Sequence, residues 1–463
     1  MINKRLGKQA LLLMALWTSL ALGCSGGGSS EESNATNVPA PATNVPAPVC
    51  PGPNQTWTST LDLDDLESKI SKASDCDTIK VEAGSATWTR TLTINKGIIL
   101  QGAGITGANL TSISIEGEGV SISLASDVPV RVTGFAFSRS TAGSTDSMIN
   151  LFGKDFRGDG VAMTQIRIDH CKFTNGGRQI FVHGWAYGVI DHNEFVNGNV
   201  SVGFSGDDNL AWARPIAAGT ADAMFVEDNT FTMDDSRLTS LNEAIYHQEG
   251  ARSVIRYNTF DGTANTTDDS LPFDTHGNQG YYSGNNDSEF RGQPLIEFYN
   301  NRVNVHHTYR MLNIRGGSII AHDNTFTTVT GSPWVFAATE EESWQSQFFN
   351  PLRTVWPAQD QVNNSFFWNN QLNGSPVTNI GLTHGTDSTF IQQDRDYFMH
   401  APAASGGMET YPGRQGAADM TFSSSGANAY YPYTPYIYPH PLVKGTSATD
   451  ASPPKAPLNL RVL

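Results

Sequence analysis

The chain has 463 residues, of which only 16% are charged, and it carries a formal net charge of −16 at pH 7. An acidic chain of this kind is a poor partner for nucleic acid, whose phosphates it repels. The length alone would allow two or three domains. The 44 glycines and the lack of a recurring amphipathic helical pattern instead predict a single long all-β body.

An export signal is expected in residues 1–23. Three basic residues precede an apolar run at 10–22, whose 13 residues fall short of the about 20 that span a membrane. Residues 21–24 (ALGC) resemble the lipobox of bacterial lipoproteins. That resemblance implies lipidation of Cys24 and a lipid-anchored protein of the cell envelope, on the outer membrane or cell surface. An ordinary secretory signal with a chance cysteine is the alternative. Residues 24–49, in which ATNVPAP occurs twice in succession, are expected to form a flexible tether.

The folded body is expected to begin between Cys50 and Cys76, and export favours a disulfide between these two cysteines. Cys171 lies inside a repeated unit and is expected to be a small buried residue. Residues 61–73 have apolar side chains at helical spacing. A lone helix ahead of several strand-like segments, which fall within 77–101, suits a cap over the open end of a solenoid.

A short unit of the form apolar-x-polar-Asn-x-Phe recurs along the chain. It occurs as IDHCKF, IDHNEF, VEDNTF, IRYNTF, FYNNRV, IAHDNTF and FWNNQL. The aligned column contains Cys171, Asn193, Asn229, Asn258, Asn301, Asn324 and Asn370, at separations of 22, 36, 29, 43, 23 and 46 residues. The shortest separations fit one coil of a parallel β-helix, and the others fit coils with insertions or double turns. We expect the asparagines to bond to one another at a left-handed bend, and the Phe column to stack in the core.

These repeats resemble those of the pectate lyase-like superfamily of right-handed parallel β-helix proteins. Further segments that carry the resemblance are 92–104 (LTINKGIILQGAG), 395–398 (RDYF) and 436–442 (YIYPHPL). The resemblance covers about residues 75–443. It implies a right-handed parallel β-helix domain at 50–443, with an N-terminal cap and a C-terminal segment along its flank, followed by a tail or linker at 444–463. Since the superfamily includes lyases, hydrolases, epimerases and binding proteins, the resemblance leaves the activity open.

Three polar residues fall at similar places in different repeats. Counted back from the asparagine of the column that follows each of them, His183 lies 10 residues before Asn193, His247 lies 11 before Asn258, and Arg315 lies 9 before Asn324. Similar offsets predict that the three side chains line one groove. Further residues expected around this groove are Trp185, Tyr246, Glu249, Asp274, His276 and Arg291.

Such a groove suits β-elimination from a uronic acid in a polysaccharide. The reaction needs a cation to neutralise the carboxylate, a base for the C5 proton and an acid for the leaving oxygen. Arg315 or Arg291 could neutralise, His247 or His276 could be the base, and Tyr246 could be the acid. The residues expected to bind substrate without reacting are His183, Arg291 and Trp185.

Two other functions stay open. Residues 206–208 (GDD), with His276 and Arg315, resemble part of the motif set of polygalacturonase-like hydrolases, which use paired carboxylates. The separation of 68 residues between Asp208 and His276 is longer than that family's spacing, and a surface loop also explains the motif. A non-catalytic adhesin or glycan-binding stalk needs only the solenoid, the tether and exposed aromatic residues. Calcium is a possible ligand of acidic pairs such as 268–269, although their spacing is not diagnostic.

Overall fold

A computed structural model describes residues 54–139, 146–155, 157–207, 209–213, 217–234, 243–266, 271–277, 291–339, 360, 362–383, 388, 391–402 and 433–444. The expectations for the export signal, Cys24, the tether, Cys50 and residues 445–463 lie outside these residues. Within them, no helix is long and apolar enough to cross a membrane.

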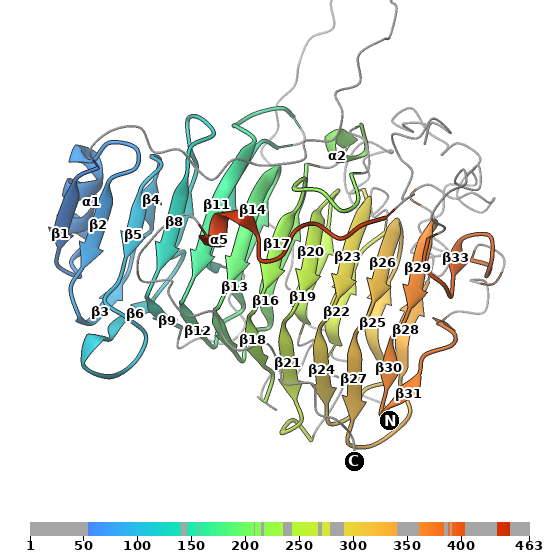
Figure 1. The fold of residues 1–463 in the computed structure, drawn as a ribbon. Helices are drawn as coiled ribbons and strands as arrows, with labels where there is room; N and C mark the ends of the chain where they lie inside the picture. Colours follow the sequence, from blue (N-terminus) through green and yellow to red (C-terminus); the bar gives the residue numbers. More distant parts are fainter. Residues whose placement is uncertain are drawn as a thin grey trace, which may run out of the picture. The chain divides into compact units, whose positions relative to one another are not determined.

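The described strands form three long sheets, which we name A, B and C, and each full coil gives one strand to each sheet (Figure 1). Sheet A contains, in spatial order, β1 (Thr56–Ser59), β2 (Thr78–Val81), β5 (Ile99–Gln101), β8 (Val130–Thr133), β11 (Met163–Asp169), β14 (Ala186–Asp191), β17 (Met224–Glu227), β20 (Arg252–Arg256), β23 (Leu295–Tyr299), β26 (Ser318–His322), β29 (Ser365–Trp368) and β33 (Tyr397–Phe398).

Sheet B contains β3 (Gly84–Trp88), β6 (Thr111–Ile115), β9 (Ala136–Ser138), β12 (Lys172–Thr174), β15 (Glu194–Val196), β18 (Thr230–Thr232), β21 (Thr259–Gly262), β24 (Arg302–Val305), β27 (Thr325–Thr328), β30 (Gln371–Leu372) and β31 (Ser375–Pro376). Sheet C contains β4 (Leu92–Ile94), β7 (Val120–Ile122), β10 (Ser147–Phe152), β13 (Arg178–His183), β16 (Val200–Ser205), β19 (Glu243–Gln248), β22 (Leu271–Thr275), β25 (Arg310–Ile314), β28 (Trp334–Ala338) and β32 (Gly381–Leu382).

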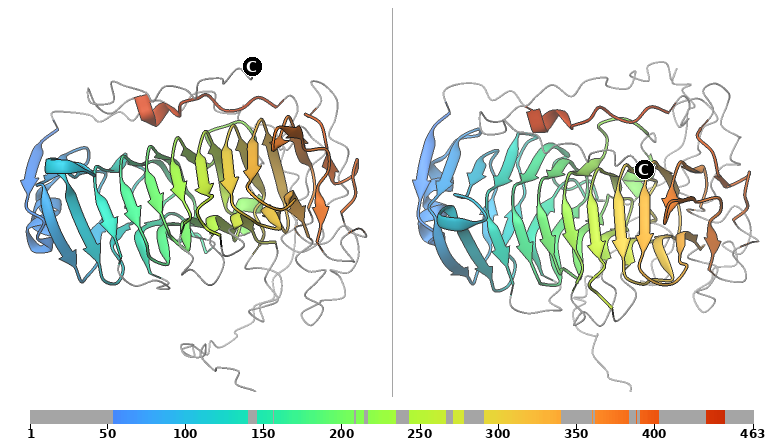
Figure 2. Two further views of the ribbon diagram at one scale, coloured as in Figure 1. Left: turned by 90° about the horizontal axis from the view of Figure 1, so that it is seen from below. Right: turned by 60° about the horizontal axis from the view of Figure 1, so that its bottom comes forward.

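Consecutive coils are paired in parallel, and Figure 2 shows the strands of each sheet running side by side in one direction. In the described part of the chain the one antiparallel strand pair is the short hairpin of β30 and β31. An all-β parallel solenoid, as the repeats predict, is therefore what the chain forms.

The core of the solenoid is built from columns of identical or similar side chains. Phe137, Phe173, Phe195, Phe231 and Phe260 occupy one register position of sheet B and are at most 1% exposed. Their ring centroids are 5.6, 5.1, 4.7 and 4.5 Å apart in turn, close to the ~4.8 Å rise between strands. The predicted Phe column is thus confirmed.

The asparagine column forms a hydrogen-bonded ladder at the corner between sheets A and B. The backbone N–H and the side-chain amide of Asn229 both donate to Oδ1 of Asn258, at 3.0 and 3.1 Å. The amide of Asn229 also donates to the carbonyl of Ile190, at 2.8 Å. The equivalent bonds join Asn193, Asn258, Asn301, Asn324 and Asn370 to their neighbours in the column. The predicted ladder is confirmed, and it fixes the register of every coil that it joins.

The left-handed residue at this corner is the one before each column residue, and not the asparagine as expected. These residues are His170, His192, Asp228, Tyr257, Asn300, Asp323 and Asn369, with φ between 50° and 58°. The left-handed residue turns the chain, while the asparagine keeps its side chain inside to bond along the ladder. The corner therefore has two residues in each of these coils, as between Glu227 and Thr230.

The helix expected at 61–73 is α1 (Leu63–Lys72). The carboxylate of Asp62 caps it by accepting from the backbone N–H groups of Asp64 and Asp65, at 2.9 and 3.2 Å. Its apolar side chains, including Leu66, join the main core. Figure 1 places α1 at the end of the stack, beside β1 and β2. The other described helices are η1 (Gly107–Asn109), α2 (Asn209–Ala213) and α5 (Pro441–Lys444).

Residues 433–444 run along the outer side of sheet A, as expected of a flank segment (Figures 1 and 2). Arg256 holds this segment by donating to the carbonyls of Tyr436 and Ile437, at 2.7 and 2.9 Å. Arg256 is itself 0% exposed and pairs with the equally buried Glu227 at 2.6 Å. The segment therefore covers an ion pair that belongs to the outer face of sheet A.

The described cysteines differ in state. Cys76 is disulfide-bonded, and the expected partner Cys50 lies outside the described residues. Cys171 is a free thiol with 0% exposure, and burial raises its pKa above the usual range. The expectation that Cys171 is a small buried residue is confirmed.

Candidate functional site on the outer face of sheet C

The outer face of sheet C carries a row of polar side chains across consecutive coils. Tyr246, Asp274 and Asn313 occupy one register position of β19, β22 and β25. In each strand this position alternates with core residues, such as Ile245 and Phe273. Because successive side chains of a strand point to opposite faces, the row points away from the core.

Asp274 is the centre of this cluster and is 0% exposed. Its Oδ1 accepts from the amide of Asn313 at 2.6 Å and from Nε of Arg315 at 3.3 Å. Nη2 of Arg315 pairs with the other carboxylate oxygen of Asp274. Arg310 in turn donates to Oδ1 of Asn313 at 3.0 Å. The buried carboxylate is thereby compensated by a guanidinium and an amide from the next coil.

His276 completes the cluster, and the rings of Tyr246 and His276 lie 5.1 Å apart between centroids. Nη1 of Arg315 lies 3.2 Å from Nδ1 of His276, and Nε2 of His276 lies 3.6 Å from Oδ2 of Asp274. Since a guanidinium can only donate, Nδ1 accepts, and the neutral ring carries its proton on Nε2, toward Asp274. The surroundings thus assign one tautomer to His276.

Two further titratable groups face this cluster, the buried Glu243 and the half-buried Tyr246. Burial, followed by repulsion from Asp274, raises the pKa of Glu243 well above its usual value, and the two carboxyl groups are hydrogen bonded. Burial, then the charges of Glu243 and Asp274, raises the pKa of the Tyr246 phenol as well. Its hydroxyl donates to Oε1 of Gln248 at 2.5 Å. The surroundings of the cluster therefore favour the neutral forms of the Glu243 carboxyl and the Tyr246 phenol.

The register corrects the expectation for His247. His183 pairs with Ser205, and Ser205 pairs with Gln248, so His183 and Gln248 share an outward position. His247 instead pairs with Phe204 of the core and is 0% exposed. Its Nε2 lies 2.8 Å from the hydroxyl of Ser253 across the interior. A one-residue difference in register turns a side chain to the opposite face, so His247 is a core residue.

Arg291 and Trp185 are also not part of the cluster. Arg291 is 0% exposed, pairs with Asp360 at 2.5 Å and lies over the ring of Trp212 at 4.7 Å. This makes Arg291 a structural residue between β22 and β23. Trp185 lies in the corner between β13 and β14, where its backbone forms a β-bridge to Lys154. The ring centroids of Trp185 and Tyr187 are 6.0 Å apart.

His183 lies on the outer face of sheet C, but three coils before His276. It stacks on Phe152 with 4.6 Å between ring centroids and an interplanar angle of 7°. Burial, then the charge of Arg178, lowers the pKa of His183 to about 4. His183 is thus a neutral aromatic surface at physiological pH and does not act with His276.

Glu243 and Asn313 were not identified from the sequence as site residues. Glu243 begins the strand that carries Tyr246, and Asn313 lies two residues before Arg315. Both therefore sit close in sequence to identified residues. Their positions follow from the parallel register of three coils, which single-strand patterns do not reveal.

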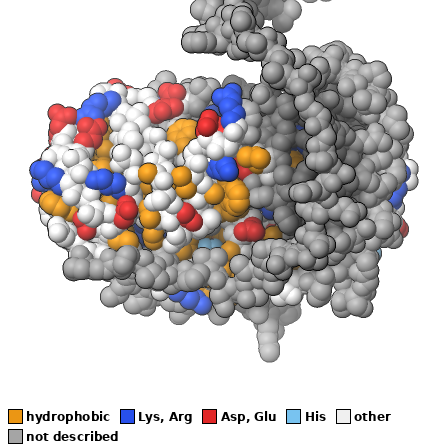
Figure 3. All heavy atoms as spheres, turned by 90° about the horizontal axis from the view of Figure 1, so that it is seen from above, with side chains coloured by type: hydrophobic (Ala, Val, Ile, Leu, Met, Phe, Trp, Pro, Cys, Tyr) orange, Lys and Arg blue, Asp and Glu red, His pale blue; other side chains and the backbone are white. Residues whose placement is uncertain are grey.

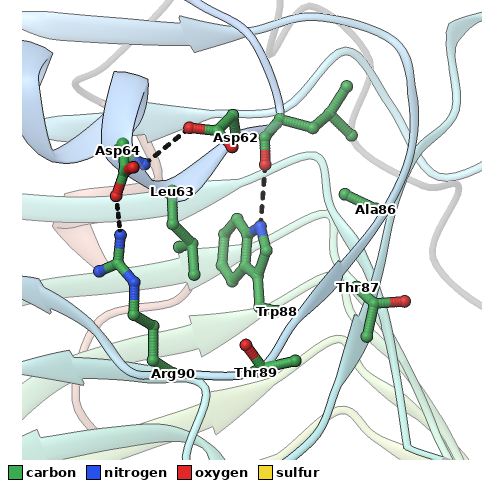
Figure 4. Close-up of a pocket in the computed structure, with 9 residues that line it drawn as sticks. Asp62, Leu63, Asp64, Ala86, Thr87, Trp88, Thr89 and Arg90 are labelled. Atoms are coloured by element: carbon green, nitrogen blue, oxygen red, sulfur yellow. Dashed lines mark hydrogen bonds and ion pairs between the residues drawn. The ribbon is translucent and has the colours of Figure 1, made fainter.

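A cavity of about 400 Å³ lies elsewhere, between α1 and the end of β3, and its lining residues include Asp62, Asp64, Trp88 and Arg90 (Figure 4). Arg90 pairs with Asp64, and the Trp88 indole donates to the carbonyl of Leu61 at 3.0 Å. The polar groups of this cavity thus serve the attachment of α1. Figure 3 shows acidic and basic side chains interspersed at this end of the molecule.

The remaining expectations concern acidic residues. Asp208 of the Gly-Asp-Asp motif and the pair 268–269 lie outside the described residues, whereas Asp207 is described and is 1% exposed. The described part of the chain contains no group of three or more His, Cys, Asp or Glu residues placed to hold a metal ion. Within the cluster, the charged group that pairs with Asp274 is the Arg315 guanidinium.

Comparison with known proteins assigns no family to the chain. No protein-family model and no curated protein matches it. Among solved structures, the crystal structure of an alginate lyase from Paenibacillus sp. str. FPU-7 is similar at a TM-score of 0.34 and 13% sequence identity, covering 72% of this chain and 98% of that one.

Proposed function

We propose that the chain cleaves a uronate-containing polysaccharide by β-elimination at the outer face of sheet C. The observation that carries the proposal is the convergence of Tyr246, His276 and Arg315. The Tyr246 and His276 rings lie 5.1 Å apart, and Arg315 lies 3.2 Å from His276. An acid, a base and a cation are the three groups that this reaction needs.

Arg315 neutralises the substrate carboxylate. In the free protein it pairs with Asp274 and donates to Nδ1 of His276. A uronate carboxylate is a stronger acceptor than a neutral imidazole, because hydrogen bonds between ionised groups are about twice as strong. Binding of the substrate therefore draws the Nη1 group of Arg315 away from His276 and leaves the lone pair of Nδ1 available.

His276 then takes the proton from C5 of the uronate. The C4–O bond breaks as the C4–C5 double bond forms, and the Tyr246 hydroxyl gives its proton to the leaving oxygen. Exchange with solvent returns a proton to Tyr246 and removes one from His276. The raised pKa of Tyr246 keeps the phenol protonated before the reaction, as an acid catalyst requires.

Glu243 and Asp274 position these groups. Asp274 fixes Arg315 and orients Nε2–H of His276. The raised pKa of Glu243 favours its neutral form, which lowers the negative charge beside the substrate. An acidic polysaccharide is repelled less by such a pair.

The test is the release of unsaturated, ultraviolet-absorbing products from a panel of uronate polysaccharides, namely polygalacturonate, polymannuronate, polyguluronate and hyaluronate. Tyr246→Phe, His276→Gln and Arg315→Lys should each lower kcat by about 100-fold or more. Matched controls on other faces are Tyr397→Phe, His170→Gln and Arg302→Lys, which should retain the rate. Absence of product from every polymer with the wild-type protein would refute the elimination.

Binding of the same glycan without cleavage is the second candidate function. It is favoured by the contacts of Arg315 and His276, which already engage each other and Asp274 in the free protein. A wild-type protein that binds one of these polymers and releases no product from it would identify this function.

The proposal includes a right-handed coil, since strand–crossover–strand connections between parallel strands of one sheet are almost always right-handed. It also includes α1 as the N-terminal cap, because its apolar face joins the core at the end of the stack. The lipobox-like sequence around Cys24 supports a place at the cell envelope, where such polysaccharides are accessible.

A further inference from the structure

Aromatic side chains lie on both sides of the polar cluster along the outer face of sheet C. Phe152 of β10 is 36% exposed, and Trp334 of β28 is 44% exposed. The cluster around Asp274 lies on β19, β22 and β25, between these two strands in the order of the sheet. Exposed aromatic rings on one face mark a binding surface when they flank convergent polar groups.

Two glycines make room for aromatic rings on this face. Both Gly203 and Gly381 occupy the outward register position that also holds Tyr246 and Asp274. A Cβ at Gly203 would lie 2.4 Å from the ring of Phe181, and a Cβ at Gly381 would lie 2.5 Å from the ring of Trp334. Each ring therefore lies flat across the neighbouring coil, where any larger residue would displace it.

The aromatic group on the N-terminal side consists of Phe152, Phe181 and His183, which we name the Phe152 platform. Phe152 and His183 are stacked at 4.6 Å, and Phe181 and His183 are 4.7 Å apart between centroids. The guanidinium of Arg178 lies 4.2 Å above the centre of Phe181. Because the pKa of His183 is lowered to about 4, its ring is uncharged in neutral solution. The platform thus combines flat apolar rings with one cation.

The group on the C-terminal side, which we name the Trp334 platform, consists of Trp334, Tyr309 and Arg310. Trp334 pairs in register with Arg310, whose guanidinium lies 4.6 Å from the centre of the exposed Tyr309 ring. The backbone N–H of Trp334 donates to the carbonyl of Tyr309 at 2.9 Å. An arginine therefore lies over an aromatic ring on both sides of the cluster, over the buried Phe181 on one side and over the exposed Tyr309 on the other.

We propose that the two platforms bind the sugar rings on either side of the reacting uronate, so that the site takes an internal stretch of a long acidic glycan. Aromatic faces suit the C–H faces of pyranose rings, and Arg178 and Arg310 suit carboxylates of the same chain. β10 and β28 are six strand steps apart in sheet C, which is about 29 Å at ~4.8 Å a step. A glycan several sugars long is needed to reach both platforms. This inference rests on the proposed function for the position of the reacting uronate.

The experiment measures binding by calorimetry with size-fractionated oligomers of each of the four polymers named above. For the polymer that binds, the affinity of the wild-type protein should rise with oligomer length until both platforms are spanned, and then stay constant. Phe152→Ala and Trp334→Ala should each weaken binding of long oligomers by roughly three- to tenfold, and less or not at all for the shortest ones. The matched control is Val329→Ala, which alters an exposed apolar residue directly after β27 of sheet B. This variant should bind as the wild type does.

An affinity that does not depend on length, platform variants that bind long oligomers as the wild type does, or no binding to any of the four polymers would each overturn the inference. The result is separable from the elimination itself. Length-dependent binding that is lost in the two variants, without any product from the wild type, would uphold the platforms and refute the proposed chemistry. Cleavage that releases only terminal units from a long chain would refute binding of an internal stretch.

Discussion

Arg315 and Asp274 form an ion pair between consecutive coils, in which the carboxylate is 0% exposed and the arginine side chain is 12% exposed. Arg315→Ala would remove the guanidinium and leave Asp274 buried beside the Asn313 amide, the His276 ring and the Glu243 carboxyl. We expect a loss of about 3 kcal/mol in the free energy of unfolding, measured by denaturant titration. Arg315 therefore supports the fold as well as the proposed reaction.

The double variant Asp274→Asn/Arg315→Ala should recover part of this loss, because the uncompensated charge is removed. Arg90→Ala removes the exposed pairing with Asp64 and should leave stability nearly unchanged. An Arg315→Ala protein as stable as the Arg90→Ala protein would contradict the buried ion pair.

His247 should make the fold sensitive to acid. Burial lowers its pKa to about 3 in the folded protein, from 6.5. A lowered folded-state pKa means that stability is full above pH 6.5 and is lost as the pH falls toward 3, by about 1.4 kcal/mol per pH unit from this one group. His247→Leu should reduce the pH dependence of unfolding in this range. An unchanged dependence would mean that other buried histidines dominate.

The asparagine ladder should be sensitive to loss of a single amide. Asn229→Leu removes the acceptor of the Asn193 N–H groups and the side-chain donor to Asn258, while the backbone donor to Asn258 stays. We expect a cost of about 1–3 kcal/mol, because the remaining partners stay buried. Asn109→Leu, at an exposed position outside the ladder, is the control. Equal melting temperatures of the two variants would argue against a stabilising role of the ladder.

Arg256 should hold the segment 433–444 on sheet A. Arg256→Ala leaves the buried Glu227 without its cation and the carbonyls of Tyr436 and Ile437 without their donor. A loss of about 3–5 kcal/mol is expected, with faster hydrogen exchange of this segment. Slow exchange in the variant would show that the aromatic contacts of the segment suffice to hold it.

Cys24 should attach the protein to a membrane. Cys24→Ala is expected to release the protein into the periplasm or the medium, whereas Cys171→Ala, which alters the buried free thiol, should leave it in the membrane fraction. Membrane fractionation of the Cys24→Ala protein like that of the wild type would exclude the lipid anchor.

Features that repeat in every coil could be predicted from the sequence. Features that depend on the register between strands, or on partners far away in the sequence, were predicted less accurately. The asparagine and phenylalanine columns are local patterns, and both were predicted correctly. His247 was misplaced because the count back from Asn258 crosses the corner between sheets C and A, whose length varies. Residues at similar offsets can therefore point to opposite faces of sheet C. Arg291 was misassigned because its partner Asp360 lies 69 residues away, in a segment without repeats. Tyr246, His276 and Arg315 were chosen as candidates by residue type, whereas the nearness of Glu243 and Asn313 to them follows only from the register.

The two-residue corner between sheets A and B has a consequence for how this molecule can vary. In the coils joined by the ladder it keeps one length, whereas long connections occur at the corners that border sheet C: β16 ends at Ser205 before β17 begins at Met224, and β28 ends at Ala338 before β29 begins at Ser365. Lengthening a connection costs little loop entropy, and the ladder holds the register regardless. Segments grafted into these corners should change what surrounds the candidate site without disturbing the stack. The stack thus keeps its register while the connections along one side vary, and ligand preference could be re-engineered there one coil at a time.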